Sequence, residues 1–239
     1  MRKLLIGGLT ASLILATPAF GARKNTQRVR AVGEGEITIQ IRDYAQANPS
    51  VLRHAEQVAG DILQKAGVAT RWIDCPVGSS RGVACSSPVS TLDFFVNLLP
   101  ESMSDRLRLP GGVLGSAIEG SGRDFGFMAS VFYDVAKDRA AAGQVDFGEL
   151  LGDAIAHELG HLLLGTNSHS GWSLMSAFWS GNQFRLVAQG LLAFSDVEAK
   201  RIHAAIHART LAATASTEAT ELSRVASTDE QFSARGNHK

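Results

Sequence analysis

The sequence has few cysteines and no excess of charge of either sign. Its 239 residues include only two cysteines, too few for a disulfide-stabilised scaffold or for a zinc site built from four cysteines. Lys and Arg total 23, as do Asp and Glu, whereas a dedicated nucleic-acid-binding protein usually has a strong basic excess. With 45% hydrophobic and 19% charged residues, the chain is also unlike the disordered polyelectrolytes. We therefore expect a globular domain with no nucleic-acid partner.

The sequence also lacks a hydrophobic run long enough to cross a membrane, but it begins like a secretory signal. Arg2 and Lys3 precede a mainly apolar stretch, Leu4–Ala16, and residues 19–21 (Ala-Phe-Gly) fit the small-x-small cleavage pattern. As a helix, the apolar stretch would rise about 20 Å, which is less than the roughly 30 Å of a hydrocarbon core. We predict a signal peptide over residues 1–21, and therefore a periplasmic or secreted protein without stable membrane insertion.

Export changes how the two cysteines are interpreted. Cys75 and Cys85 stand ten residues apart in a stretch rich in Gly and Ser, and in an oxidising compartment two such cysteines usually pair. On the chain-entropy model, closing so short a loop stabilises the folded state by roughly 2–3 kcal/mol. We predict a disulfide, with two free thiols as the alternative. No metal role is expected, because no third ligand stands near them in the sequence.

The region between the two ends of the chain is predicted to contain both strands and helices. Residues 22–35 are interpreted as a linker and residues 210–239, rich in Ala, Ser, Thr and Glu, as a disordered tail. This leaves residues 36–209 for one folded domain. Hydrophobic periodicity predicts strands over 36–42, 68–73, 92–98, 113–118 and 127–133, and helices from 49 to about 66 and over 134–142, 146–164 and 196–209. This order of elements indicates an α+β domain with a mixed sheet.

One segment carries residues with evident chemistry. Residues 157–169 have the sequence HELGHLLLGTNSH, which begins with the HExxH pattern of zinc hydrolases. Leucine, isoleucine and alanine fill most other positions of the predicted helix 146–164, and a helix that is apolar nearly all round is buried. Burying two histidines and a carboxylate on such a helix costs free energy unless they bind a partner such as a metal ion. The alternative is a core with satisfied histidines.

Helix geometry explains the spacing within this motif. His157 and His161 lie one turn apart on the same face, so both can present a ring nitrogen to one Zn²⁺ at about 2.0–2.1 Å. Glu158 lies about 100° further round the helix and is suited to reach a water on the ion rather than the ion itself. We predict Glu158 as the general base that takes a proton from that water and later passes it to the leaving amine.

A catalytic zinc site usually has three protein ligands and one open position. Gly165 can end the helix with a left-handed residue, so the chain can turn back and bring His169 to the metal. We predict His169 as the third ligand of a single catalytic zinc ion. Glu198, on a downstream helix, is a less favoured third ligand because with Ser195 it forms a Ser-x-x-Glu capping box.

Several neighbouring residues could support such a site. Asp153 lies one turn before His157 and could orient its imidazole, or it could simply be a polar residue on the rim of the helix. Trp172, Phe178 and Trp179 could line a substrate pocket, although aromatic side chains more often pack in the interior.

The motif resembles that of the metzincin zinc proteases, whose pattern is HExxHxxGxxH followed by a Met-turn. Residues 173–175 (Ser-Leu-Met) look like that turn, with Met175 as an apolar floor beneath the metal. The segment also resembles a group of uncharacterised exported bacterial proteins that carry HELGHLLLGxNSHS and a following Met. It departs from the metzincin pattern by one extra residue before Gly165 and one extra residue before His169.

The resemblance implies a zincin-like fold, with a mixed twisted sheet and a central active-site helix. It also implies a peptide or protein substrate that binds as an added strand along the sheet edge above that helix. Phe127–Tyr133 is the candidate edge, with an ordinary core strand as the alternative. We predict an exported zinc-dependent metalloendopeptidase. The alternatives are a non-catalytic secreted zinc-binding domain or a zinc amidohydrolase acting on a non-protein amide, and the intact Glu158 favours catalysis.

Overall fold

The structure is a computed structural model. It describes residues 36–75, 77, 85, 90–104, 106, 112–118, 120, 125–165 and 167–236, with side chains up to residue 219 except that of Ser104. The predicted signal peptide (1–21) and linker (22–35) lie outside the described residues. Across the described part of the chain, no helix is both long enough and apolar enough to span a membrane.

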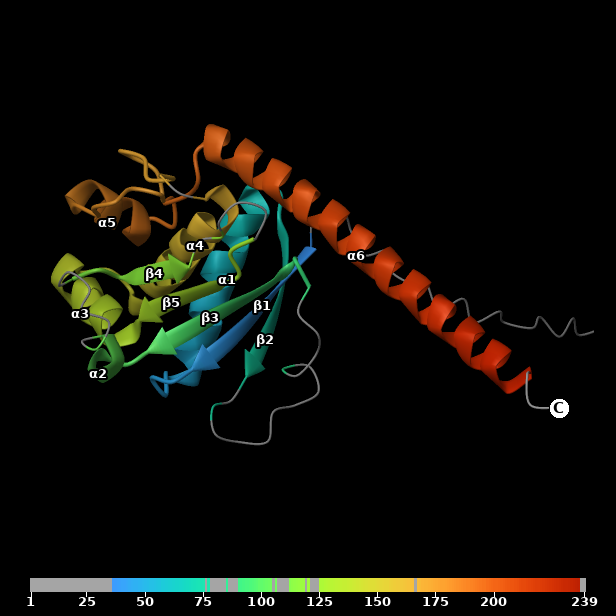
Figure 1. The fold of residues 1–239 in the computed structure, drawn as a ribbon. Helices are drawn as coiled ribbons and strands as arrows, with labels where there is room; N and C mark the ends of the chain where they lie inside the picture. The colour runs from blue at the N-terminus through green and yellow to red at the C-terminus, as the bar shows by residue number, and fades with distance from the viewer. Residues whose placement is uncertain are drawn as a thin grey trace, which may run out of the picture. The chain divides into compact units, whose positions relative to one another are not determined.

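A mixed sheet forms the centre of the domain (Figure 1). Its five strands are β1 (Glu36–Asp43), β2 (Ala69–Cys75), β3 (Asp93–Leu99), β4 (Gly115–Ile118) and β5 (Met128–Phe132). They lie in the order β2-β1-β3-β5-β4. Neighbouring strands are parallel except for β4 and β5, which are antiparallel. The predicted α+β class with a mixed sheet is therefore confirmed.

The edge of the sheet near α4 is β4, so the prediction of Phe127–Tyr133 as the edge strand is wrong. The strand in that segment, β5, pairs with β3 on one side and β4 on the other. Its side chains Ala129, Val131 and Phe132 are buried, as expected for an internal strand. A short apolar run has the same periodicity in either position, and the sequence alone does not distinguish them.

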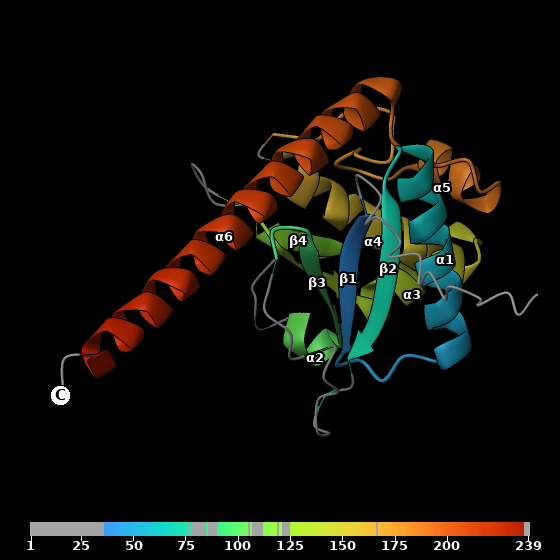
Figure 2. The same ribbon diagram turned by 90° about the vertical axis from the view of Figure 1, so that its right-hand side faces the viewer.

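The helices are α1 (Pro49–Lys65), α2 (Glu101–Ser104), α3 (Tyr133–Gly143), α4 (Phe147–Leu164), α5 (Gly181–Ala188) and α6 (Asp196–Gly236). α1 and α4 pack side by side against the sheet (Figure 1, Figure 2). The two helices approach closely at Gly152, where a Cβ would lie 2.6 Å from the Ala55 carbonyl oxygen. The short helices α2 and α5 are absent from the sequence prediction, because too few residues carry their periodicity.

The last helix is longer than predicted. The sequence placed its end at residue 209 and disorder over 210–239, whereas α6 continues to Gly236. Residues 210–235 contain neither Gly nor Pro, so nothing in this stretch stops a helix once it has begun, and its alanines and glutamates favour one. The stretch has little to bury: Leu211, its first bulky apolar residue, is 60% exposed.

A buried arginine anchors α6 to the domain. Arg209 is 2% exposed and donates hydrogen bonds to the carbonyl oxygens of Thr91 (2.9 Å), Gly126 (2.8 Å) and Leu162 (2.8 Å). Its guanidinium lies 4.7 Å from the ring centre of Phe94, and burial lowers its pKa to about 10. Since Leu162 belongs to α4, this residue joins the last helix to the helix that carries the HExxH motif.

The predicted disulfide between Cys75 and Cys85 is present. Cys75 is the last residue of β2 and is buried. The bond therefore ties Cys85 to the end of that strand.

Candidate metal centre

Helix α4 carries His157 and His161 through the interior of the domain. Asp146 caps its start by accepting a hydrogen bond from the Glu149 amide at 3.0 Å. Nearly every other side chain of the helix is buried, as its apolar sequence predicted. The helix ends at Gly165, whose φ of 77° and ψ of −167° suit glycine far better than other residues.

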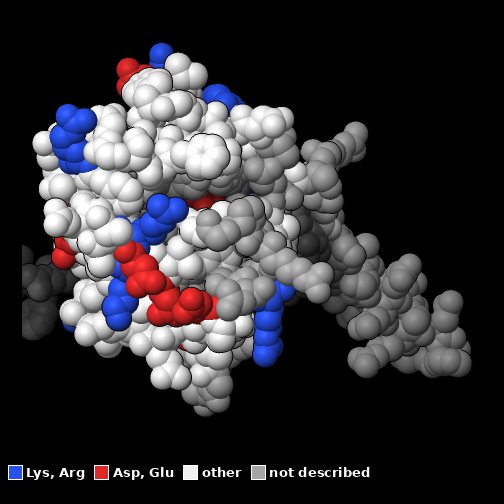
Figure 3. All heavy atoms as spheres, turned by 90° about the vertical axis from the view of Figure 1, so that its left-hand side faces the viewer, with Lys and Arg blue, Asp and Glu red and all other residues white. Residues whose placement is uncertain are grey.

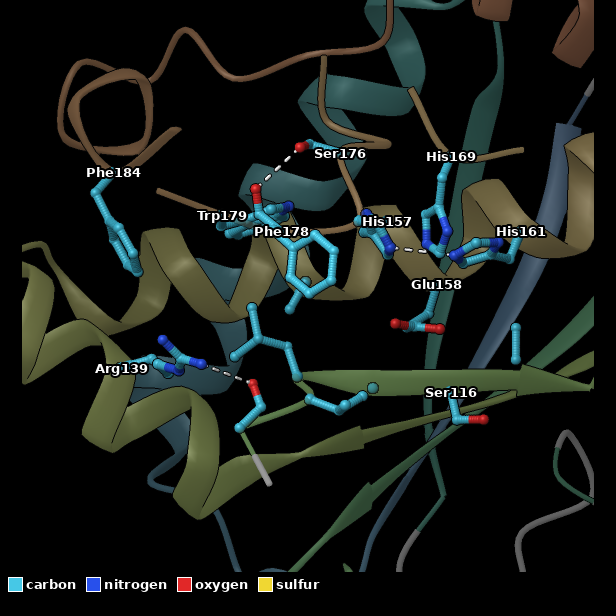
Figure 4. Close-up of a pocket in the computed structure, with 17 residues that line it drawn as sticks. Ser116, Arg139, His157, Glu158, His161, His169, Ser176, Phe178, Trp179 and Phe184 are labelled. Carbon is cyan, nitrogen blue, oxygen red and sulfur yellow. Dashed lines mark hydrogen bonds between the residues drawn. The ribbon is translucent and has the colours of Figure 1, made fainter. Parts of the chain in front are cut away.

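Three histidines converge beside this helix (Figure 4). The Nε2 atoms of His157 and His161 are 3.1 Å apart, and His169 completes a group whose ligand atoms all lie within 4.8 Å of one another. Two nitrogen ligands of a tetrahedral zinc ion lie about 3.3 Å apart. The three histidines are thus placed to hold a metal ion, and the chain beyond Gly165 brings His169 back to the helix.

Each helix histidine is oriented through its other ring nitrogen. His157 Nδ1 lies 2.7 Å from the Leu174 carbonyl oxygen, which can only accept, so Nδ1 carries the proton and Nε2 keeps its lone pair. Ser168 Oγ lies 2.8 Å from His161 Nδ1, and Ser168 is itself buried. Both rings are held with Nε2 toward the centre of the group, as metal ligands require.

Asp153 does not take the orienting role considered for it, because the Leu174 carbonyl occupies His157 Nδ1. Nor is it a rim residue, since only 3% of it is exposed. Burial raises the pKa of Asp153 well above its ordinary value, the charge of Glu149 raises it further, and Lys65 opposes this shift.

The surroundings of His157 and His161 favour the neutral form of both rings. Burial lowers the pKa of His157 to about 4, although its hydrogen bond to Leu174 acts in the opposite direction. Burial also lowers the pKa of His161 to about 3, with further contributions from His157 and His169. Neutral imidazole is the form that binds a metal, so this environment favours metal binding.

Glu158 lies between α4 and the edge strand. It is 4% exposed, and its Oε2 atom has no hydrogen-bond partner among the described residues. A Cβ at Gly115 of β4 would lie 2.6 Å from Glu158 Cγ, so glycine at this position makes room for the carboxylate. Burial raises the pKa of Glu158 to about 8. An orphaned buried oxygen is unfavourable by itself, and it fits a group whose partner is a bound ion, water or substrate.

The predicted Met-turn lies directly against the HExxH helix. Met175 is fully buried, and a Cβ at Gly160 would lie 2.5 Å from its sulfur atom. Gly160, which stands between the two motif histidines, is therefore required for this contact. The sequence prediction did not identify its role, because the contact depends on the path of a loop outside the helix.

Glu198 supports the predicted Met-turn through Ser173 and does not belong to the group of described residues that could hold a metal ion. Its Oε2 accepts the Ser195 amide at 2.7 Å, and the Glu198 amide donates to Ser195 Oγ at 3.3 Å, which confirms the capping box. Its Oε1 accepts the Ser173 hydroxyl at 2.8 Å. Ser173 Oγ in turn accepts the Met175 amide at 3.1 Å. The start of α6 is thus linked to the turn whose Leu174 carbonyl orients His157.

A cavity of about 800 Å³ opens beside the histidines and Glu158. β4 and the segment before it form one wall, and Phe178, Trp179 and Phe184 form another (Figure 4). Of the aromatic residues considered from the sequence, Phe178 and Trp179 line the cavity and Trp172 does not. Phe184 and Arg139 also line it, and neither was marked by any sequence pattern.

Comparison with known proteins gives one distant structural match. No protein-family model matches the sequence, and no curated protein sequence matches it. Among solved structures, the crystal structure of archaemetzincin from Methanopyrus kandleri matches with a TM-score of 0.44 and 13% sequence identity. The match covers 74% of this chain and 99% of that one.

Proposed function

We propose that this protein is an exported zinc-dependent metalloendopeptidase of metzincin-like build. The observation that carries the proposal is the pairing of three converging histidines with Glu158, a buried carboxylate whose Oε2 has no partner in the described part of the chain. Both lie on a cavity bounded by the edge of a sheet.

The donor set suits a catalytic zinc ion. His157, His161 and His169 would hold it through three nitrogen atoms, which leaves one position open for substrate or water. A zinc ion bound there would lower the pKa of a coordinated water and polarise the carbonyl of a scissile amide. Met175 packs beneath the histidines against Gly160, so the helix backbone and the turn hold the ligands in place.

Glu158 is the proposed general base and acid. Its burial keeps bulk water from its carboxylate, and Oε2 has no competing partner among the described residues. The carboxylate can therefore take a proton from the attacking water and deliver it to the leaving amine.

The proposed substrate strand lies along β4. The Phe132 amide donates to the Leu114 carbonyl at 2.9 Å, so these two residues form a hydrogen-bonded pair. Such pairs alternate along an antiparallel ladder, and the backbone groups of Gly115 and Ala117 consequently point away from β5. An extended peptide could pair with them by strand addition, close to Glu158.

Export is part of the proposal and is supported by two features of the chain. The N-terminal pattern is that of a signal peptide. The disulfide between Cys75 and Cys85 is of a kind that persists mainly in oxidising compartments.

The test combines metal analysis with cleavage of a peptide library by the purified mature protein and its variants. Wild type should contain one zinc ion per chain and cleave peptides, Glu158→Ala should keep the zinc and lose cleavage, and His169→Ala should lose zinc. His207→Ala, which changes an exposed histidine of α6, is the matched control and should behave as wild type. Zinc without cleavage in wild type would contradict the peptidase function, and full zinc retention in His169→Ala would remove the third ligand.

A further inference from the structure

The cavity beside the three histidines has one guanidinium group among its described lining residues. Among the residues that line it, Arg139 of α3 is the one Lys or Arg, and Glu158 is the one carboxylate. In the view of Figure 4, Phe178 lies between Arg139 and the histidines. The cleft therefore has a metal-binding end and a cationic end, with aromatic side chains between them.

Arg139 is held in place by a backbone contact rather than by an ion pair. Its Nη2 donates to the Gly112 carbonyl oxygen at 3.2 Å, and a Cβ on Gly112 would lie 2.5 Å from Nη2. A guanidinium carries five N–H donors, so this bond uses one of them. The ion pairs within 4.0 Å among the described residues do not include Arg139.

A second cavity continues from the same point. It has a volume of about 460 Å³, shares Arg139 and Phe184 with the first cavity, and is also lined by Arg185. Arg185 donates to Asn182 Oδ1 at 2.6 Å. The described residues that line this second cavity include no carboxylate. A group that passes Phe184 would thus meet two guanidinium groups and no acidic side chain of the described chain.

The charge on the surrounding surface is mixed. Figure 3 shows that the face formed by α3 and α5 is mostly uncharged, with a few basic side chains and a group of acidic ones. None of these acidic side chains lines either cavity, apart from Glu158. Recognition here would therefore come from short-range contacts within the cleft rather than from a long-range field.

We propose that the Arg139 end of the cleft is a subsite that binds a carboxylate of the substrate. The carboxylate is either an acidic side chain near the scissile bond or the free C-terminus of the peptide. A guanidinium fork pairs with a carboxylate through two parallel hydrogen bonds, and Arg139 is exposed, so a carboxylate in the cleft can reach it. The inference rests on the proposed peptidase function and specifies its substrate class.

The test uses peptides matched except for one carboxylate. One series carries Glu or Gln at each position around the scissile bond, and a second has a free or an amidated C-terminus. Wild type should cleave the carboxylate member with a kcat/KM about three- to tenfold higher, as expected for a pair with an exposed guanidinium. Arg139→Gln should abolish this ratio, and Arg139→Lys should retain part of it. Arg53→Gln, which removes an exposed charge on α1, should keep the full ratio.

Equal kcat/KM values for both members of every wild-type pair would overturn the subsite, as would a preference that survives Arg139→Gln. A preference in the first series would show that Arg139 binds an acidic side chain, and a preference in the second would show that it binds the terminal carboxylate. Equilibrium binding of the same peptide pairs to the zinc-loaded protein separates the two proposals. An Arg139-dependent preference in binding without any cleavage would support the subsite and contradict the peptidase function. Cleavage without a preference for the carboxylate peptide would support the peptidase function and contradict the subsite.

Discussion

Two pairs of histidines in this chain have the same spacing and different surroundings. His157 and His161 on α4 are largely buried, and their Nε2 atoms lie 3.1 Å apart. His169, from the segment after the helix, joins them in one group. His203 and His207 on α6 are four residues apart as well, but both are exposed. The described residues contain no metal-binding group that includes the second pair. A helical i, i+4 pair thus supplies two ligands at most, and a site requires a third ligand from elsewhere in the fold.

The largest expected effect tests this contrast directly. His157→Ala should abolish retention of zinc during gel filtration and with it all peptide cleavage, because it removes one of three ligands. His203→Ala should leave the zinc content at one per chain. Zinc retained by the first variant, or lost from the second, would contradict the difference between the two pairs.

A second effect concerns the packing beneath the first pair. Gly160→Ala should reduce the free energy of unfolding by about 1–3 kcal/mol, since its methyl group would overlap the Met175 sulfur and the Phe194 ring. Gly181→Ala is the matched control, because nothing lies within 4 Å of a Cβ at that position. Urea denaturation of the metal-free proteins measures both. Equal stabilities would show that Met175 can move aside at little cost.

A third, smaller effect, on zinc affinity, tests whether α6 supports His157 and His161 through the predicted Met-turn. Ser173→Ala removes the group that joins Glu198 to the Met-turn. It should weaken zinc binding about ten- to a hundredfold, as is typical when a residue supporting a ligand is lost. A chelator competition titration measures the affinity, with Ser50→Ala on α1 as the control. An unchanged affinity would mean that the Leu174 carbonyl orients His157 without help from α6.

The smallest expected effect, on the pH dependence of stability, comes from a comparison of two buried carboxylates, Glu158 and Glu56. Like Glu158, Glu56 has a buried oxygen without a partner. Burial and the neighbouring Asp74 raise its pKa to about 8, and within the described ranges Glu56 belongs to no group that could hold a metal ion. The folded state therefore holds a proton that the unfolded state releases, so stability should fall as pH rises from about 4.5 to 8.

Glu56→Gln should make this decline shallower without changing zinc content, while the buried Asp153 and Glu158, whose pKa values are also raised, keep the rest of it. Denaturation midpoints between pH 5 and pH 9 measure the slope. The same decline in the variant as in wild type would assign the pH dependence to other groups.

Most elements of the fold could be predicted from the sequence, because their hydrophobic periodicity is local. The strands and the helices α1, α3 and α4 occur where their patterns indicated. The place of β4 at the edge could not be predicted, since strand order depends on which surfaces pack together and not on the periodicity of any one strand. The extent of α6 was also missed, because the absence of apolar residues after Arg209 predicted disorder rather than an exposed helix.

The candidate metal centre likewise has features that the sequence predicted and features that it did not. HExxH, Gly165 and His169 could be identified because the chemistry of a zinc ligand set imposes residue types and spacings. The contacts of Gly160, Ser173 and Arg139 could not be identified, because each involves a partner from a different element.

The sequence by itself determined which three histidines could hold a metal ion, the helix that presents two of them, and the glycine that turns the chain toward the third. These follow from helix geometry and from the donors that zinc prefers, both of which act over a few residues. Only the tertiary structure decided that β4 borders the cavity and that α6 supports the Met-turn through Glu198. It also decided that Arg139 faces the same cleft as Glu158. These relations join residues far apart in the chain, and only the packing of the whole domain brings them together.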